Sequence, residues 1–282
     1  MEIGGSNPLG VATSRLFPAD RRDGATIGAM SMHPEASTGF ARGAAAYERG
    51  RPDYPSAAVG WLAARLGLGP GKLVVDLGAG TGKLTRQLVP FGARVIALEP
   101  VHEMAAELER VVAGVEVQAE TVASTSLASG SVDAATAGQS FHWFADQSSL
   151  REIHRILRPG GRLGLVWNRR DPHSQLWRAV SDLIEPLRHG SPDHSTGEWR
   201  RQLRASHLFG PLESRAFPHQ QQATPDQLAD RVLSLSFVAA SVQPVQERVR
   251  EQVLELAAEY QGRPGRPLAL PYQSEVFACR AC

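Results

Sequence analysis

Cysteine is nearly absent from this 282-residue chain: only Cys279 and Cys282 occur, both at its C-terminal end. A disulfide framework needs several cysteine pairs, so the small disulfide-rich folds are excluded. The two residues form a CxxC pair, which can be half of a zinc site, but no second pair of ligands is present. We therefore expect two thiols on a frayed tail, in a protein of a reducing compartment.

The chain also lacks a long apolar run and an excess of charge of one sign. No apolar stretch approaches the ~20 residues that cross a bilayer, and the N-terminus has no basic-then-apolar signal pattern. Lys and Arg number 30 against 29 Asp and Glu, so the formal net charge is +1. A dedicated nucleic-acid binder usually has a basic surplus. We expect a cytoplasmic protein without a membrane or nucleic-acid partner.

One glycine-rich stretch stands out, at residues 73–82, with the sequence LVVDLGAGTG. An apolar run bounded by glycines is typical of a buried parallel strand, and a helix is predicted directly after it. Because glycine has no side chain, Gly78, Gly80 and Gly82 would let a ligand approach the backbone of the turn. The stretch therefore predicts a site for a polar or anionic small molecule. A tight strand-to-helix turn without a ligand is the alternative.

Strand and helix patterns alternate from Leu73 to Asn168 with short connectors, which predicts a doubly wound, parallel α/β sheet. Strand patterns near 211–221 and 270–281 bring the predicted sheet to about seven strands. Residues 1–38 mix Gly, Pro, Ser, Asp and Arg without periodicity, so we expect a disordered extension there. No histidine has ligand spacing, so no metal site is expected.

Glu99 ends the second predicted strand, in the motif ALEP. In a doubly wound sheet its carboxylate lies across the crevice from the glycine turn, where an acid accepts hydrogen bonds from a ribose diol. A solvated acid at a strand end is the alternative. A nicotinamide dinucleotide is disfavoured, because the G-x-G-x-x-G fingerprint needs its third glycine one residue after Gly82. The GxxxxGK(S/T) spacing of a P-loop is absent as well.

Five motifs in order resemble those of the class I S-adenosylmethionine-dependent methyltransferases. Three are general: VVDLGAGTGKLT, ALEP and REIHRILRPGGRLGLVW. Two more, YERGRPDYP and GQSFHWF, resemble a small-molecule branch similar to trans-aconitate methyltransferases. The resemblance implies a Rossmann-like sheet with a mostly helical cap. It divides the chain into a cofactor-binding core with N-terminal lid helices at 39–168, a helical cap insertion at 169–210, and strands and helices at 211–282 that complete sheet and cap.

The resemblance implies S-adenosylmethionine as the cofactor. The residues it assigns to cofactor binding are Tyr47, Arg51, Asp76, Gly78, Ala79, Gly80, Glu99, Pro100, Met104 and Gln139. Of these, Glu99 would hold the ribose, Pro100 and Met104 would flank the adenine, and Tyr47 and Arg51 would cover the cofactor as part of a lid. Met104 and Tyr47 are equally good candidates for core packing.

The methionine part of the cofactor would lie along Asp76 and the turn glycines, with Gln139 nearby. From the residues alone, Asp76 would fix the turn or attract a cationic group. One position departs from the pattern of the branch: after the third strand an Ala-Glu pair is usual, but this chain has Val122 and Ala123. The usual acid beside the adenine is therefore missing, and Glu120 or a backbone contact would replace it.

The implied reaction is in-line attack of a substrate nucleophile on the sulfonium methyl group, with the protein supplying alignment and exclusion of water. A carboxylate nucleophile needs no base, whereas a hydroxyl or amine does. His142, after the fourth strand, is the candidate base, or it only shapes an aromatic wall. Trp143 is expected in the substrate wall.

Asn168, Arg169 and Arg170 follow the fifth predicted strand, at the same edge of the sheet. We expect Asn168 and Arg169 to contact the substrate, because an arginine there could clamp a carboxylate through two parallel hydrogen bonds. A solvated arginine pair is the alternative. The expected activity is methyl transfer to an O, N or C nucleophile of a small molecule, carboxylates included. A nucleic-acid or protein methyltransferase, or a silent cofactor-binding protein, remains the alternative.

Overall fold

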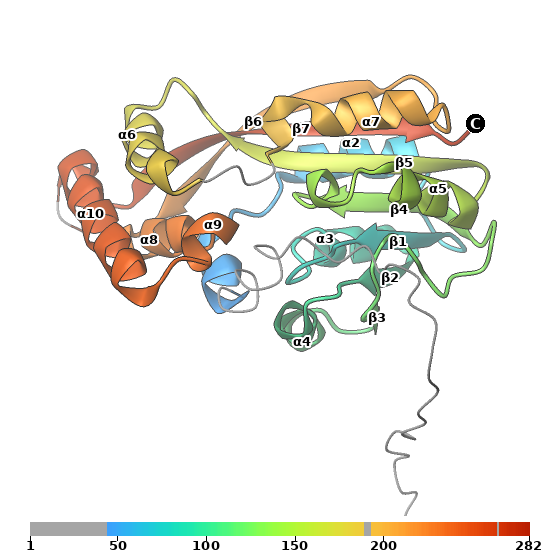
Figure 1. The fold of residues 1–282 in the computed structure, drawn as a ribbon, viewed down its shortest axis with the longest axis horizontal. Coiled ribbons are helices and arrows are strands. Elements are labelled where there is room, and N and C mark those ends of the chain that lie inside the picture. The colour runs from blue at the N-terminus through green and yellow to red at the C-terminus, as the bar shows by residue number, and fades with distance from the viewer. Residues whose placement is uncertain (1–43, 189–192, 264) are drawn as a thin grey trace, which may run out of the picture. The chain divides into compact units, whose positions relative to one another are not determined.

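The computed structural model describes residues 44–188, 193–263 and 265–282 (Figure 1). The extension predicted for residues 1–38 lies outside these ranges. Residues 44–50 are helical. No helix in the described ranges combines the length and the apolar character needed to cross a bilayer.

Seven strands form one sheet in the order β3-β2-β1-β4-β5-β7-β6. Neighbouring strands from β1 to β5 pair in parallel, β7 runs antiparallel to β5, and β6 runs antiparallel to β7. The predicted doubly wound, mostly parallel α/β sheet is confirmed. The strands are β1 (Leu73–Leu77), β2 (Arg94–Leu98), β3 (Glu116–Gln118), β4 (Val132–Gly138), β5 (Leu157–Arg170), β6 (Glu213–Ala223) and β7 (Leu268–Arg280).

Helices bury the sheet on both faces. Successive side chains of its central strands point to opposite sides, so each strand packs against helices on both faces. In β1, Val75 and Leu77 pack into the cluster that includes α5 and α7, whereas Val74 packs with α2 and α3. A smaller cluster joins β2 to α4. The helices around the sheet are α2 (Ser56–Leu66), α3 (Thr85–Leu88), α4 (His102–Val111), α5 (Gln147–Ile156) and α7 (Glu198–Ser206).

A second apolar cluster joins four helices to the first residues of β7. Figure 1 shows these helices together at one end of the sheet. They are α6 (Gln175–Ile184), α8 (Pro225–Leu233), α9 (Ser236–Ala239) and α10 (Gln243–Gln261). They form the helical cap. Helix α7 falls in the range expected for the cap insertion, but its Trp199 and Leu203 pack against the sheet instead.

Two predicted helices end earlier than their sequence pattern indicates. The pattern REIHRILRPGG predicts a helix closed by Pro159 and the two glycines after it, but α5 stops at Ile156, because β5 already begins at Leu157 and pairs with β4. The pattern TPDQLADRVLSLSFVAA predicts a single helix with Thr224 as its N-cap and Pro225 at its first position. It is divided into α8 and α9, since Leu235 between them has an extended backbone. The predicted start of α8 is confirmed: the Thr224 hydroxyl accepts the Gln227 N–H at 3.2 Å, in a capping box.

The frayed C-terminal tail expected from the sequence is wrong for Cys279. This residue lies in β7, pairs with Leu163 of β5 and is 5% exposed. Burial raises the pKa of its thiol to about 12, so it behaves as a small core residue. Cys282 is exposed, but its backbone N–H donates to Leu208 O at 2.9 Å and its carbonyl is 3.0 Å from His154 Nε2.

Candidate functional site

The turn after β1 uses its three glycines for different purposes. All three have positive φ, between 60° and 83°. A Cβ on Gly78 would lie 3.0 Å from Ser140 Cβ, and one on Gly82 would lie 2.9 Å from Leu108 and Val112 of α4. Only Gly80 faces open space, with no atom within 4 Å of such a Cβ. The expectation that all three glycines open the turn to a ligand is therefore wrong for Gly82, which is buried and makes room for protein side chains. Gly78 makes room for Ser140 on one side but is itself partly exposed.

Asp76 lies beneath this turn and is fully buried. Its carboxylate accepts hydrogen bonds from Thr85 Oγ1 at 2.6 Å and from Thr136 Oγ1 at 2.9 Å. Burial raises its pKa to about 6, although both hydrogen bonds act in the opposite direction. This carboxylate ties β1 to the helix after the turn and to β4, which is the turn-fixing role considered for it.

Glu99 stands at the end of β2, next to the turn, and is 6% exposed. One carboxylate oxygen accepts the Gly80 N–H at 2.8 Å and the other accepts the Val101 N–H at 2.8 Å. Burial raises its pKa to about 7, with a further contribution from the charge of Asp76. Ala79 lies between these groups and donates its N–H to Leu98 O at 3.0 Å. Glu99 is thus a buried acid with lone pairs left for further donors.

Gln139 follows β4 and has a φ of +62°, a strained value for a residue with a side chain. Its N–H donates to Val166 O at 2.9 Å and its side-chain amide to Asn168 O at 3.2 Å. These bonds hold the strained backbone at the carboxyl edge of the sheet, between the ends of β4 and β5. Strain of this kind concentrates at ligand sites.

The helical residues 44–50 lie against the turn and carry Tyr47, one of the two predicted lid residues; the other, Arg51, directly follows them. Glu48 accepts Thr81 Oγ1–H at 2.6 Å and pairs with Arg86 at 2.6 Å. Tyr47 packs in a small cluster with Met104, which is 3% exposed, so Met104 has the packing role considered for it. Pro100 is partly buried beside that cluster. The guanidinium carbon of Arg51 lies 4.5 Å from the centre of the Tyr47 ring.

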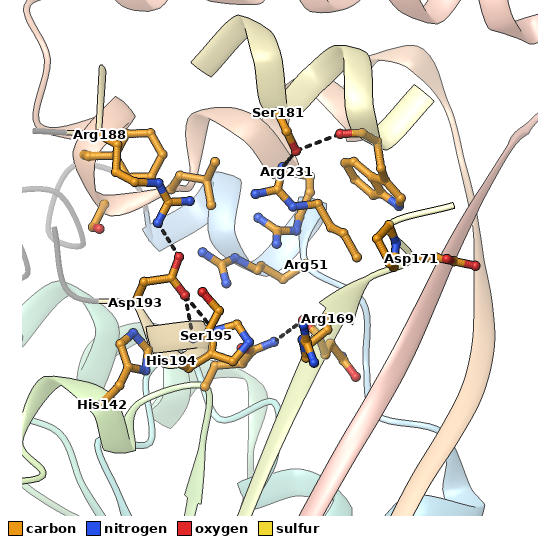
Figure 2. A pocket seen from close by; sticks show the side chains of 18 of the residues that line it. Arg51, His142, Arg169, Asp171, Ser181, Arg188, Asp193, His194, Ser195 and Arg231 are labelled. Atoms are coloured by element: carbon orange, nitrogen blue, oxygen red, sulfur yellow. Dashed lines mark hydrogen bonds and ion pairs between the residues drawn. The ribbon is translucent and has the colours of Figure 1, made fainter. Parts of the chain in front are cut away.

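A cavity of about 520 Å³ opens where the cap meets the carboxyl ends of β4 and β5. Its wall takes Gln139 from the end of β4, Arg170 from β5, Trp177 from α6, Arg231 from α8 and Phe237 from α9. Figure 2 shows labelled side chains of this wall converging on one space. The sheet supplies the floor of the cavity and the cap encloses it.

His142 and Trp143 lie in this wall, as expected for the residues after β4. The indole N–H of Trp167 lies 3.4 Å from His142 Nδ1 and donates to it. Since Nδ1 accepts this bond, the neutral imidazole carries its proton on Nε2. Burial lowers the pKa of His142 to about 3, with a further contribution from His194. These observations argue against the role of general base and leave His142 as a hydrogen-bond donor.

Asn168 and Arg169 also line the cavity, but their polar groups already have partners. Asn168 Nδ2 donates to the carbonyls of Pro52 and Asp53, both at 3.3 Å, and its Oδ1 accepts Ser274 Oγ–H at 2.5 Å. Arg169 Nη1 pairs with Glu275 at 2.6 Å. Both lie inside β5 rather than after it. Asn168 therefore positions the segment after residue 51, and the clamp expected at Arg169 is neutralised.

The neighbouring Arg170 and the cap residue Arg231 were not assigned to the site by the sequence analysis. Arg170 faces α6, where its Nη1 donates to Ser181 Oγ at 3.4 Å. Arg231 is 5% exposed, in the last turn of α8. One signal was available for it: Arg231 follows Leu228 by three residues, so a cation stands on the apolar side of an amphipathic helix.

Glu120, considered as a replacement for the missing adenine-side acid, is partly buried in the loop after β3. Glu120 accepts the Ser126 N–H at 2.8 Å and so fixes the loop after β3.

No group of three or more His, Cys, Asp or Glu side chains in residues 44–188, 193–263 and 265–282 has an arrangement that could hold a metal ion.

Taken together, the turn, the acid and the cavity lie at one edge of the sheet. A strand order with a switch between β1 and β4, a glycine turn after β1 and an acid after β2 define an α/β protein that binds a nucleoside-type cofactor. The adjoining cavity provides for a second molecule.

Comparison with known proteins identifies the family. Residues 75–165 match the family described as a methyltransferase domain. An uncharacterized methyltransferase of Mycobacterium tuberculosis is 35% identical over 237 residues, which cover 84% of this chain and 93% of that protein. The ubiquinone biosynthesis O-methyltransferase of Pseudomonas aeruginosa is 28% identical over 158 residues, 53% of this chain and 66% of that enzyme.

A solved structure described as a type II methyltransferase of Anaeromyxobacter dehalogenans has a TM-score of 0.63 at 25% identity. The match covers 82% of this chain and 97% of that chain. The chain therefore belongs to the class I S-adenosylmethionine-dependent methyltransferases.

Proposed function

We propose that this enzyme moves the methyl group of S-adenosylmethionine to an oxygen of a small acid held in the cavity under the cap. One observation supports this best: the cavity is lined both by Tyr47 and Gln139, which the family motifs assign to the cofactor, and by residues of the cap. A molecule in that cavity would lie beside the cofactor while the helices shield it from water.

The residues around the turn fit this cofactor. The open space beside Gly80 admits a ligand to the backbone, and the Glu99 carboxylate has lone pairs free for ribose hydroxyls. Two hydroxyl donors would also compensate the burial of this carboxylate, which at present has only two backbone N–H partners. S-Adenosylmethionine brings an activated methyl group when it is bound, so the protein needs only to orient the acceptor.

The chain's own residues would orient and shield the acceptor. The His142 Nε2–H can donate to an oxygen of the acceptor that does not react, and Trp143 supplies an apolar wall. Because His142 is a poor base, an acceptor that reacts as a carboxylate is favoured, since it needs no proton removed. The name of the Pseudomonas relative, an O-methyltransferase, supports oxygen as the methylated atom. The motifs YERGRPDYP and GQSFHWF support the branch similar to trans-aconitate methyltransferases.

Calorimetry with S-adenosylhomocysteine tests the cofactor site. The wild type is expected to bind, and Glu99→Ala is expected to lose about 1–3 kcal/mol of binding free energy, because ribose donors lose their buried acceptor. Glu107→Ala, which removes a half-buried acid of α4 paired with Arg110, serves as the matched control. Unchanged affinity of the Glu99 variant would contradict the role given to that acid.

Methyl transfer itself is tested with methyl-labelled S-adenosylmethionine and pooled small metabolites, RNA or protein. Label is expected in the small-molecule fraction. Absence of S-adenosylhomocysteine binding by the wild type would contradict the proposed function as a whole. Label found only in RNA or protein would contradict the small-molecule acceptor.

A further inference from the structure

Three arginines of the cavity, Arg51, Arg170 and Arg231, come from three separate parts of the chain. We propose that they bind a compact dianionic group of the methyl acceptor, a phosphate ester or two neighbouring carboxylates, and that this group is an anchor distinct from the atom that receives the methyl. The inference rests on the proposed function, because it describes part of the same acceptor. Figure 2 shows the guanidinium groups of Arg51 and Arg231 facing the same space.

The charges of the cavity do not balance without a ligand. Six arginines and three aspartates line it. Asp193 already pairs with Arg188, and Arg169 pairs with Glu275 at 2.6 Å. In the described part of the chain, none of the three proposed arginines has a carboxylate within ion-pair distance. The three arginines, one buried and two half-buried, thus outnumber the remaining lining carboxylates, Asp171 and Asp182, neither of which pairs with them. Holding such cations without a paired carboxylate is costly, so the cluster indicates a site for an anion.

Arg231 carries the argument furthest. It is 5% exposed, and its Nε is buried without an acceptor. An unpaired buried donor on a charged group costs free energy that a bound anion would recover. The pKa of Arg51 is lowered to about 10, mainly by burial and secondly by the charge of Arg231. The same two causes lower the pKa of Arg170 to about 10. The positive charge of Arg231 therefore acts on both Arg51 and Arg170, so an anion placed among the three would interact with all of them.

The other two guanidinium groups are positioned by neutral contacts that leave donors free. Arg51 donates to Ser234 Oγ at 3.2 Å and to Ser234 O at 3.3 Å. Arg170 donates to Ser181 Oγ at 3.4 Å and lies 5.5 Å from the centre of the Trp177 ring. Each guanidinium has five N–H donors, so several remain for a ligand. Such preorganised forks match phosphate and carboxylate oxygens.

The dianionic group bound here would not be the nucleophile. Hydrogen bonds from several guanidinium groups withdraw charge from the oxygens that they bind, which makes those oxygens poorer donors of an electron pair. The acceptor would therefore have two polar ends, one fixed by the arginines and one that reacts. A cavity of about 520 Å³ has room for a small molecule of this kind.

Binding of simple anions to the full-length protein tests the subsite. Inorganic phosphate and succinate would be titrated by calorimetry and by thermal denaturation, with acetate, neutral succinamide and sodium chloride at equal ionic strength as comparisons. We expect one dianion to bind and to raise the melting temperature, whereas acetate and succinamide have little effect. Phosphate as the better ligand would identify a phosphate ester, and succinate two carboxylates.

The variant Arg231→Met should weaken binding of the dianion about tenfold to a hundredfold, the loss of one charge-assisted contact. Because it removes an uncompensated buried charge, its melting temperature without anions should equal or exceed that of the wild type. Arg170→Gln should also weaken the dianion. Arg178→Gln, which removes an exposed cation from the rim of the same cavity, is the matched control and should bind as the wild type does.

Three results would overturn the subsite. One is that neither dianion stabilises the wild type more than sodium chloride does. Another is that Arg231→Met lowers the melting temperature yet keeps the full response to the dianion, as a purely structural arginine would. The third is that Arg178→Gln weakens binding as much as Arg231→Met, which indicates diffuse attraction. Binding of S-adenosylhomocysteine, measured in the same samples, separates each of these from failure of the proposed function.

Discussion

At the scale of single residues, the two buried acids of the site differ in whether a ligand can reach their carboxylates. Asp76 has two hydroxyl donors at 2.6 and 2.9 Å and is closed off by Thr85 and Thr136. Glu99 likewise accepts two hydrogen bonds, from the N–H groups of Gly80 and Val101, but it is 6% exposed and lies beside the open side of Gly80. Its pKa is raised to about 7, mainly by burial, so the folded protein holds this carboxylate at a cost that further donors would reduce.

This difference predicts a pH dependence of cofactor binding. Ribose donors favour the ionised carboxylate, so the dissociation constant of S-adenosylhomocysteine should rise as the pH falls below about 7, by at most about tenfold per pH unit. Without ligand, the raised pKa has the opposite sign for folding: this acid's contribution to stability falls as the pH rises from 4.5 to about 7. Calorimetry between pH 6 and 8, roughly one unit either side of that pKa, measures the binding effect.

Glu99→Gln is the control for that profile, because it keeps an acceptor oxygen and does not titrate. The variant should show a flat dissociation constant over the same range. A slope that survives in it, centred near pH 6, would belong to Asp76, whose pKa is raised to about 6. The unchanged wild-type slope in Glu99→Gln would contradict the assignment to Glu99.

At the scale of elements, the turn after β1 combines two tasks that its glycines separate. Gly82 lets the turn pack against α4, where a Cβ would lie 2.9 Å from Leu108 and Val112. Gly80 also has a positive φ but faces open space. Gly82 is needed for folding of the protein, and Gly80 is needed for access of the ligand to the turn.

Two alanine substitutions should separate these tasks. Gly80→Ala is expected to cost about 1–2 kcal/mol of stability from backbone strain and to weaken S-adenosylhomocysteine binding further, since its methyl group occupies the ligand space. Gly82→Ala adds overpacking against α4 to the same strain, so it should cost about 2–5 kcal/mol. Urea denaturation and calorimetry measure both. Equal loss of stability in the two variants would contradict this division.

At the scale of the whole molecule, the sheet and the cap have separate apolar cores. The cofactor turn belongs to the sheet, whereas Arg231 and the α6 wall belong to the cap. The helical residues 44–50 contact both, through Glu48 with Arg86 and through Arg49 with Asp230. A substitution that destabilises only the cap core should therefore impair the acceptor site more than it impairs the cofactor site.

Leu228→Ala tests this separation, because Leu228 is fully buried in the cap core. The substitution is expected to cost about 2–5 kcal/mol through loss of apolar contact and a residual cavity. Amide exchange should accelerate in α8 and α10 but not in β1 and β4, and S-adenosylhomocysteine affinity should persist while methyl transfer falls. Leu228→Met, which nearly conserves volume, is the control. Equal acceleration in β1 and β4 would indicate one cooperative unit instead.

The amino-acid sequence predicted the sheet well, because its strands have strong local signals. The apolar run before Gly78 and the capping pattern at Thr224 each follow from local propensity and hydrogen bonding. Boundaries were less predictable: β5 begins at Leu157, within a helical pattern, since pairing with β4 outweighs helix propensity there. The burial of Cys279 likewise depends on pairing of β7 with β5.

By itself, the sequence determined the family and the edge of the sheet where the cofactor turn lies, because those depend on motifs that are local in the chain. Only the tertiary structure decided which cations share the cavity. Arg51, Arg170 and Arg231 are far apart in the chain, and Arg169 beside them is neutralised by Glu275. Whether a buried charge has a partner depends on contacts between distant elements, which no local pattern of residues contains.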